Sequence, residues 1–246
     1  MKPRRESQRP LLPQHARHCP VLEAGSAAGA LVFPPLAPHE AFQVGYQGEG
    51  RYKFAYYLNP AGTKWETIFT VTFALPAGAV GAVQETVEFA IDGGPISPEH
   101  ALLTARMFVA VDDLGTPAGA VTLRGAWGFR TPEGWDTIYT PVFNLIERPV
   151  APMLVVRVET DWYVHDSEFR YVLQAGEALS ASHALPIGQA LFVPRQDVEF
   201  GECDDEELAS LQQAREEFAR AKAAVRRTSA YGLEYSPHYA RTKRDR

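Results

Sequence analysis

Three charged side chains at alternate positions are the strongest candidates in this sequence for a chemical or binding role. Arg157, Glu159 and Asp161 are separated by Val and Thr residues, which favour β-strands. Alternate side chains of a strand project from the same face, so the three would form a row at steps of about 7 Å. If that face meets solvent or a neighbouring chain, the row forms surface ion pairs. If the sheet is open on that side, two carboxylates beside an arginine could bind a cation or a polar ligand.

Two more polar residues could join this row. Asn144 ends the strand-like segment that precedes it, and Arg170 lies in the strand-like segment that follows it. We therefore predict a ligand-binding set in which every member is polar or charged, and we assign no residue a catalytic role. The set consists of Asn144, Arg157, Glu159, Asp161 and Arg170.

The histidines do not follow a known metal-binding spacing. The facial triad of a non-haem iron oxygenase needs a His-x-Asp pair and a distant His. His165 and Asp166 are adjacent, so in a strand their side chains would point to opposite faces. A cupin site needs two His one residue apart, and the sequence has no such pair. His183 could serve as the distant metal ligand only if an unrecognised pair of ligands lay elsewhere in the sequence. We therefore predict no metal and no cofactor.

Nucleophilic chemistry has equally little support in the sequence. The sequence contains no Gly-x-Ser-x-Gly elbow, the turn that presents a catalytic serine. Cys19 precedes Pro20 and is expected to be a small buried side chain. Cys19 and Cys203 are too far apart in sequence to indicate a metal site or a disulfide framework. A reducing compartment is the simpler interpretation.

The elements that must position these residues are mostly strands. Apolar and polar residues alternate along many short segments, which are separated by Gly, Pro and Asp turns. The segments are 42–46, 51–58, 69–75, 87–91, 107–111, 121–129, 135–144, 153–163, 168–175 and 185–193. Ser97 to Leu103 could form one helical turn, with Ser97 as its cap and Pro98 first in the helix. This pattern predicts a mainly β protein, an antiparallel β-sandwich or jelly roll with a C-terminal α-helix.

The chain after Phe200 has a helical pattern. Acidic residues open a helix at Asp204, and it runs to about Arg227. Its stripe at spacings of three and four consists of Leu208, Leu211, Arg215, Phe218, Lys222 and Val225. A stripe this thin predicts that the helix lies on the sandwich or pairs with a neighbour. Gly232 and Pro237 should end any helix, and the aromatic tail around them should dock on its own domain or on another copy.

Composition and charge set the remaining expectations. The predicted parts are a flexible basic segment 1–18, a β-sandwich 19–200, an amphipathic helix 201–228 and an aromatic, basic tail 229–246. The net charge is -6, and both ends are basic, so the body between them is acidic and should repel nucleic acid. No run approaches the roughly 20 apolar residues of a membrane helix, and no signal peptide is evident. We expect a soluble, cytoplasmic protein that self-associates through its C-terminal helix and tail.

Several short motifs between Phe129 and Arg195 form a recognisable set. They are Thr131-Pro132-x-Gly134-Trp135, Thr140-Pro141-Val142-Phe143-Asn144, Val158-Glu159-Thr160-Asp161-Trp162, Leu185-Pro186-Ile187-Gly188-Gln189 and Val193-Pro194-Arg195, with Cys19-Pro20 near the start. With these motifs the chain resembles an uncharacterised family of proteins found in bacteria and in bacteriophage genomes. The resemblance implies a β-rich, jelly-roll-like fold of unassigned activity and brings no catalytic residues. The helix and tail after Phe200 lie outside it.

Two functions are compatible with these patterns. The first is a non-catalytic β-sandwich that binds or assembles, as part of a homo-oligomer or of a phage-related particle. A thin apolar helix stripe and a tyrosine-rich tail favour it, because both need a surface to cover. The alternative is a metal-dependent oxygenase of the jelly-roll or cupin kind. That alternative rests on fold analogy, and one fold hosts many functions.

Overall fold

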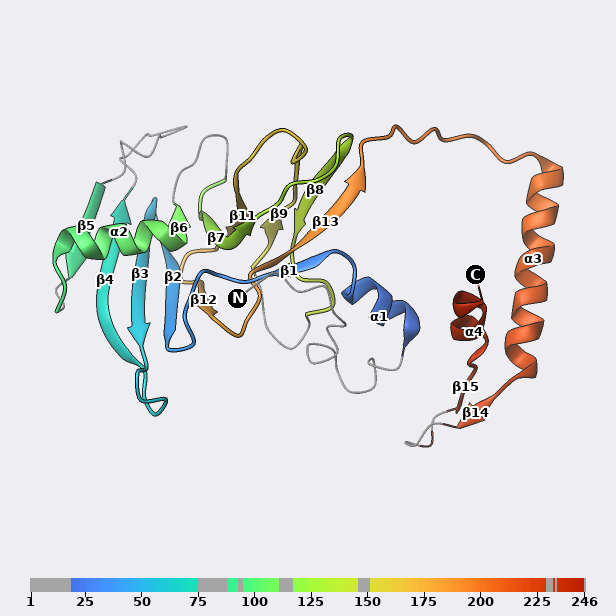
Figure 1. Cartoon of the computed structure of the whole chain (residues 1–246), viewed down its shortest axis with the longest axis horizontal. Helices are drawn as coiled ribbons and strands as arrows, with labels where there is room; N and C mark the ends of the chain where they lie inside the picture. Colours follow the sequence, from blue (N-terminus) through green and yellow to red (C-terminus); the bar gives the residue numbers. More distant parts are fainter. Residues whose placement is uncertain are drawn as a thin grey trace. The chain divides into compact units, whose positions relative to one another are not determined.

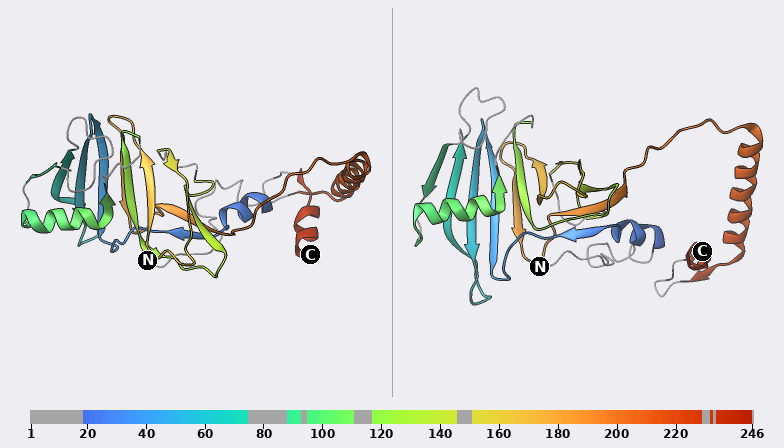
Figure 2. Two further views of the ribbon diagram at one scale, coloured as in Figure 1. Left: turned by 90° about the horizontal axis from the view of Figure 1, so that it is seen from above. Right: turned by 45° about the horizontal axis from the view of Figure 1, so that its top comes forward.

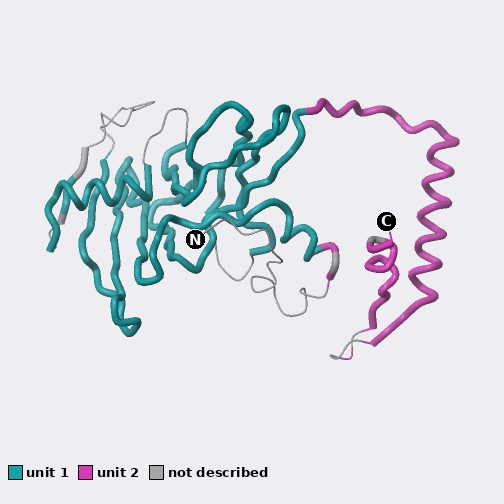
Figure 3. The backbone as a smooth tube through the Cα atoms, viewed as in Figure 1, with its two compact units in different colours: residues 1–17, 22–195 teal, residues 18–21, 196–246 magenta. Residues whose placement is uncertain are grey.

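The fold of the described residues is mainly β, with a helix near the C-terminus, as the alternating pattern predicted (Figure 1). The computed structural model describes residues 19–74, 88–92, 95–110, 117–145, 151–228, 232 and 234–245. The chain divides into two compact units, residues 1–17 with 22–195 and residues 18–21 with 196–246 (Figure 3). All strand pairs between the described residues are antiparallel.

A five-stranded sheet forms one end of the larger unit. Its order is β12 (Ala178–Ser182), β2 (Glu40–Gly48), β3 (Arg51–Leu58), β4 (Glu66–Ala74) and β5 (Glu88–Asp92). The alternation places large aromatic side chains on one face, where Phe42, Phe54 and Phe69 are all buried. The opposite face carries smaller and more polar side chains such as Gln43 and Thr72, which explains the period of two in the sequence.

Helix α2 (Pro98–Phe108) covers the aromatic face of this sheet (Figure 2). Ser97 caps it, since its hydroxyl accepts a hydrogen bond from the backbone N–H of His100 at 3.3 Å. The Phe108 ring stacks on Phe42 at 5.3 Å between centroids and on Tyr56 at 6.0 Å. Helix α2 is also longer than the single turn that we predicted from Ser97 to Leu103.

The strand predicted over 107–111 is largely wrong. Met107 belongs to α2, and only β6 (Val109–Ala110) is a strand. Val111 lies outside the described residues. The helix continues to Phe108 because Ala101, Ala105 and Phe108 form its buried stripe, at spacings of four and three.

Two four-stranded sheets make up the rest of the larger unit. One has the order β6, β7 (Ala120–Gly128), β11 (Asp166–Val172) and β9 (Met153–Leu154). The other has the order β1 (Ala30–Val32), β13 (Gly188–Pro194), β8 (Trp135–Thr140) and β10 (Val156–Val158). β9 and β10 follow each other directly, so the chain passes from one sheet to the other at Val155.

The larger of two hydrophobic clusters among the described residues runs through all three sheets of the larger unit. Tyr139 of β8 and Phe169 of β11 meet edge to face, with 5.5 Å between ring centroids, and join the two four-stranded sheets. Val44, Phe54 and Val71 continue the core into the five-stranded sheet. Antiparallel sheets around a common core confirm the mainly β class, while the jelly-roll order of strands stays a prediction.

The smaller unit contains the C-terminal helix and a structured tail. Its elements are α3 (Asp205–Ala224), β14 (Arg227–Thr228), β15 (Glu234–Tyr235) and α4 (His238–Arg244). Asp204 and Glu207 form a capping box at the start of α3, as its acidic opening suggested. No described helix runs through Gly232 or Pro237, as predicted, but α4, which the sequence analysis did not predict, begins directly after Pro237. Proline is compatible with a helix start, where the N–H that it lacks would have no helical partner.

None of the described helices is both long enough and apolar enough to span a membrane.

Candidate functional site

The predicted residues Arg157 and Asp161 belong to one charged network at an end of the β8–β13 sheet. Arg157 Nε donates a hydrogen bond to Asp136 Oδ2 at 2.5 Å, and Arg195 Nε donates to Asp136 Oδ1 at 2.8 Å. The Nη2 of Arg195 reaches Asp161 Oδ1 at 2.7 Å. The result is a chain of alternating charge in which Asp136 and Arg195 are the central members.

Both carboxylates of this network are held in the ionised form. Their side chains are only 3% exposed at Asp136 and 8% exposed at Asp161. Hydrogen bonding to Arg195 lowers the pKa of Asp136, and Arg157 adds to the effect. Arg195 also lowers the pKa of Asp161, with the backbone N–H of Gly134 as the second cause. In return, the two carboxylates raise the pKa of the Arg195 guanidinium.

Backbone hydrogen bonds fasten the loops that carry the network. The N–H of Gly134 donates to Asp161 Oδ2 at 3.0 Å, and the N–H of Arg195 donates to the carbonyl of Gly134 at 2.7 Å. Gly134 has a φ of 76°, which a residue with a side chain rarely adopts. The Gly of this motif is thus required by the turn that binds Asp161.

A row of buried hydroxyl groups continues the network inward. Thr160 Oγ1 lies 2.9 Å from Thr131 Oγ1 and 2.7 Å from Thr137 Oγ1. The hydroxyl of Thr131 donates to the carbonyl of Trp135 at 2.7 Å. All three threonines are buried, so these bonds satisfy hydroxyl groups that solvent does not reach.

The prediction of one strand over 153–163 is wrong, and with it the row of three charges. The strand β10 ends at Val158, and Glu159 to Tyr163 form a turn in which the Tyr163 N–H donates to the Glu159 carbonyl at 2.9 Å. Thr160 turns inward to the buried hydroxyl groups, which breaks the alternation. The carboxylate of Glu159 accepts from the indole N–H of Trp162 and takes no described part in the ion pairs.

Asn144 and Arg170 lie in other contacts. Asn144 Nδ2 donates to Ser26 Oγ at 2.8 Å and to the Leu22 carbonyl at 3.2 Å, both in helix α1 (Pro20–Ser26). Arg170 Nε donates to Thr122 Oγ1 at 3.0 Å, across the β7–β11 pair. Of the five predicted residues, only Arg157 and Asp161 are therefore linked by described contacts, through Asp136 and Arg195.

A second buried group, unnoticed in the sequence, fastens the end of α1. Gln189 of β13 is fully buried and accepts a hydrogen bond from the Phe143 N–H at 2.9 Å. Its side-chain amide donates to the carbonyls of Ala28 and Ser26. Together with Asn144, this glutamine ties the segment after β8 and the segment after α1 to the sheet. Its place in the Ile-Gly-Gln motif was the only signal in the sequence.

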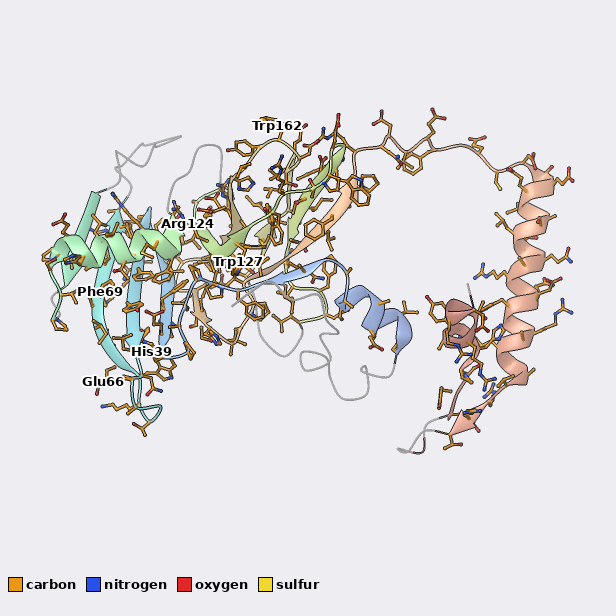
Figure 4. The ribbon with its side chains drawn as sticks, viewed as in Figure 1. His39, Glu66, Phe69, Arg124, Trp127 and Trp162 are labelled. Atoms are coloured by element: carbon orange, nitrogen blue, oxygen red, sulfur yellow. The ribbon has the colours of Figure 1, made fainter. Side chains whose placement is uncertain are left out.

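The turn after β10 carries the most exposed aromatic residues near the network. Trp162, which is labelled in Figure 4, is 66% exposed. Tyr163 is 50% exposed, and the centroids of the two rings are 5.7 Å apart. The hydrogen bond to Glu159 holds the Trp162 indole in place. Asp161 lies in the same turn, and its contacts with Arg195 and Gly134 connect the aromatic turn to the charged network.

Helix α3 offers a second kind of surface. None of its residues is buried among the described parts of the chain. Leu208 is 46% exposed, Leu211 is 61% exposed and Phe218 is 37% exposed. The ring of His238, at the start of α4, contacts the Phe218 ring at 4.9 Å between centroids. Within the smaller unit, the tail therefore contacts Phe218 and leaves Leu208 and Leu211 exposed.

The described residues include no group of three or more His, Cys, Asp or Glu side chains placed to hold a metal ion. Most of the short motifs between Thr131 and Arg195 contribute residues to the two networks described above. One set surrounds Asp136, Asp161 and Arg195, and the other surrounds Asn144 and Gln189.

Comparison of the chain with protein-family models, with curated proteins and with solved structures found no match.

Proposed function

We propose that the protein is a non-catalytic binding and assembly protein, in which the C-terminal helix and tail mediate self-association. The observation that carries this proposal is α3, a helix of 20 residues with none buried among the described parts of the chain. Its Leu208 and Leu211 expose apolar side chains on one stripe. Helices in proteins gain most of their stability by packing an apolar face against another surface, so such a stripe needs a covering surface.

The charged network of the β unit supports a binding role over a catalytic one. Asp136 and Asp161 are ionised and engaged by arginines, so neither carboxyl group is free to give or take a proton. The turn that contains Asp161 exposes the aromatic side chains of Trp162 and Tyr163 to solvent, and a hydrogen bond to Glu159 holds the Trp162 indole. Trp, Tyr and Arg are the residue types that dominate protein interfaces.

The test is the mass of the full chain in solution, measured by sedimentation equilibrium over a range of concentrations. We expect a concentration-dependent oligomer. The double variant Leu208→Glu, Leu211→Glu should sediment as a monomer, because it places charges on the stripe. The matched control is Ser210→Glu, Gln213→Glu, which adds the same charges to the same helix off the stripe and should leave the oligomer intact.

A chain that is monomeric at all concentrations would contradict the proposal. So would a stripe variant that associates as strongly as the control. Circular dichroism of each variant verifies that helix content is retained, so that loss of association is not confused with loss of α3.

The alternative, a metal-dependent oxygenase, has no described contact in its favour and stays a prediction from fold analogy. Metal analysis of the purified protein tests it, and iron bound in a one-to-one ratio would replace our proposal. The link to bacteriophage proteins rests on the motif resemblance, and we retain it as a proposal on the origin of the β unit.

A further inference from the structure

The aromatic turn, residues 159–163, exposes more of its ring surface than other aromatic residues of the β unit do. Trp162 is 66% exposed, whereas the other three tryptophans of the chain are 39–44% exposed. Tyr163 beside it is 50% exposed. Tryptophan is highly buried in most folded proteins, so a ring face left this open is typical of a binding surface.

Both rings of the turn are held in place before any ligand arrives. The indole N–H of Trp162 donates to the Glu159 carboxylate, and the N–H of Tyr163 donates to the Glu159 carbonyl at 2.9 Å. The Tyr163 ring also contacts His165, with 5.1 Å between centroids. His165 in turn contacts the fully buried ring of Tyr139, at 5.8 Å between centroids. Rings fixed in this way lose little conformational entropy on binding.

The polar groups of the turn can both accept and donate hydrogen bonds. Glu159 is exposed and bonds the indole through Oε2, so Oε1 remains an acceptor. Arg195 contacts Asp161 of the same turn through Nη2 and Asp136 through Nε, and none of its described contacts uses Nη1. Its side chain is 35% exposed. A ligand at this turn must therefore combine an apolar face with groups that donate to a carboxylate and accept from a guanidinium.

A neutral saccharide meets each of these requirements. One face of a pyranose ring consists of C–H bonds, whose slight positive charge matches the negative face of an aromatic ring. Sugar hydroxyl groups donate to Glu159 Oε1, and sugar oxygens accept from Arg195 Nη1. An anion or an organic cation would be attracted by one of these two charged groups and repelled by the other.

We propose that the aromatic turn binds a neutral saccharide, which stacks on Trp162 and Tyr163 and bonds Glu159 and Arg195. This inference rests on the binding role proposed above for the β unit and names the class of its ligand. It is independent of α3, to which self-association is assigned.

Calorimetric titration of the full chain with neutral oligosaccharides tests the assignment. The probes are cellohexaose, xylohexaose, mannohexaose and chitohexaose. We expect at least one of them to bind with a dissociation constant in the millimolar range or below. Saturation-transfer NMR should then place the strongest contacts on C–H protons of the pyranose rings. Failure of all four probes to bind at millimolar concentrations would overturn the inference.

Variants of the exposed tryptophans locate the bound saccharide. Trp162→Ala should weaken binding by about tenfold or more, because it removes the stacking face. Trp162→Phe keeps a ring face and should retain most of the affinity. The matched control is Trp65→Ala, which removes a tryptophan that is 44% exposed directly before β4 and should leave the affinity unchanged. Trp162→Ala binding as tightly as the control would place the saccharide elsewhere and overturn the inference. Circular dichroism and urea midpoints verify that each variant is folded.

Two further measurements separate this inference from other uses of the turn. Choline is titrated in the same way, and binding of choline through Trp162 without binding of any saccharide would make the turn a cation site. Trp162→Ala should sediment with the same mass as the unchanged chain. Loss of the oligomer in this variant would make the turn a contact between copies, which also overturns the inference. If no saccharide binds but the oligomer still depends on Leu208 and Leu211, the self-association proposal stands and the saccharide site alone is wrong.

Discussion

At the scale of single residues, Arg195 is the point at which three segments of the β unit meet. Its guanidinium contacts Asp136 and Asp161, and its N–H contacts Gly134. Arg157, by contrast, contacts Asp136 and is half exposed. The difference matters for stability, because ion pairs that solvent reaches contribute little.

We therefore expect Arg195→Met to lower the urea midpoint of unfolding clearly more than Arg157→Met does. Without Arg195, both carboxylates remain in nearly buried positions with fewer partners, and an uncompensated charge is costly there. Both variants lose one cation, so the comparison controls for net charge. Equal midpoints would mean that the network is a surface feature without a structural role.

The lowered pKa values of Asp136 and Asp161 predict a pH dependence. A carboxyl group whose pKa is lower in the folded state stabilises the fold fully above its unfolded pKa of about 3.9. That contribution is lost as the pH falls through the lower folded-state value. Urea midpoints measured from pH 7 to pH 2 should therefore decline steeply below about pH 4.

The variant Asp161→Asn isolates this effect. It should be less stable than the unchanged chain at pH 7 and should show a shallower decline in acid, since one titrating group has been removed. A decline as steep as that of the unchanged chain would assign the acid sensitivity to other carboxyl groups.

The sequence pointed to part of this network and missed its centre. Arg157 and Asp161 were predicted because they alternate with strand-forming residues. Arg195 was quoted within a motif and Asp136 was not singled out, and the two were not recognised as partners, since pairing between segments far apart in the sequence leaves no periodic signal. Glu159 was included for its spacing, although the inward turn of Thr160 separates it from the ion pairs.

At the scale of elements, the aromatic face of the five-stranded sheet depends on α2. Phe108 is 3% exposed and stacks on three aromatic rings of the sheet, whereas its neighbour Met107 is 54% exposed. We expect Phe108→Ala to lower the free energy of unfolding by about 3–5 kcal/mol, as buried Phe truncations do.

Met107→Ala is the matched control, and an exposed position of this kind should change the free energy of unfolding by no more than about 0.5 kcal/mol. Urea unfolding followed by circular dichroism measures both. Similar losses in the two variants would show that the helix does not seal the sheet.

Strands with large alternating side chains were predictable, and the other elements were less so. Tyr52 and Phe54 mark β3 clearly, and its predicted bounds agree with the structure. β12 (Ala178–Ser182) was missed, because small residues give a weak strand signal. The full length of α2 was missed because Met107 and Val109 also fit an alternating pattern. Short elements of this kind are decided by packing, which single-sequence periodicity does not contain.

At the scale of the whole chain, the smaller unit contains an exposed segment that directly follows the last residue of the larger unit. Residues 196–203 belong to no helix or strand, and Phe200 is 96% exposed. Proteases prefer such segments to packed elements. We expect brief chymotrypsin treatment to cut first after Phe200 and to release a β fragment that ends there.

Mass spectrometry of the products identifies the first cut. The variant Phe200→Ser should resist at this position and be cleaved more slowly overall. First cleavage within a strand of the larger unit would contradict the division of the chain into two compact parts.

The position of Arg195 has a mechanical consequence. It is the last residue of the β unit, so tension along the following segment arrives there first. Pulled from this end, β13 would peel from its neighbours one hydrogen bond after another. The contacts of Arg195 with Gly134, Asp136 and Asp161 distribute such a load over the start of β8 and the turn after β10 before peeling can begin. Arg195 neutralises two carboxylates and thus also resists mechanical unfolding at the residue where the chain leaves the β unit.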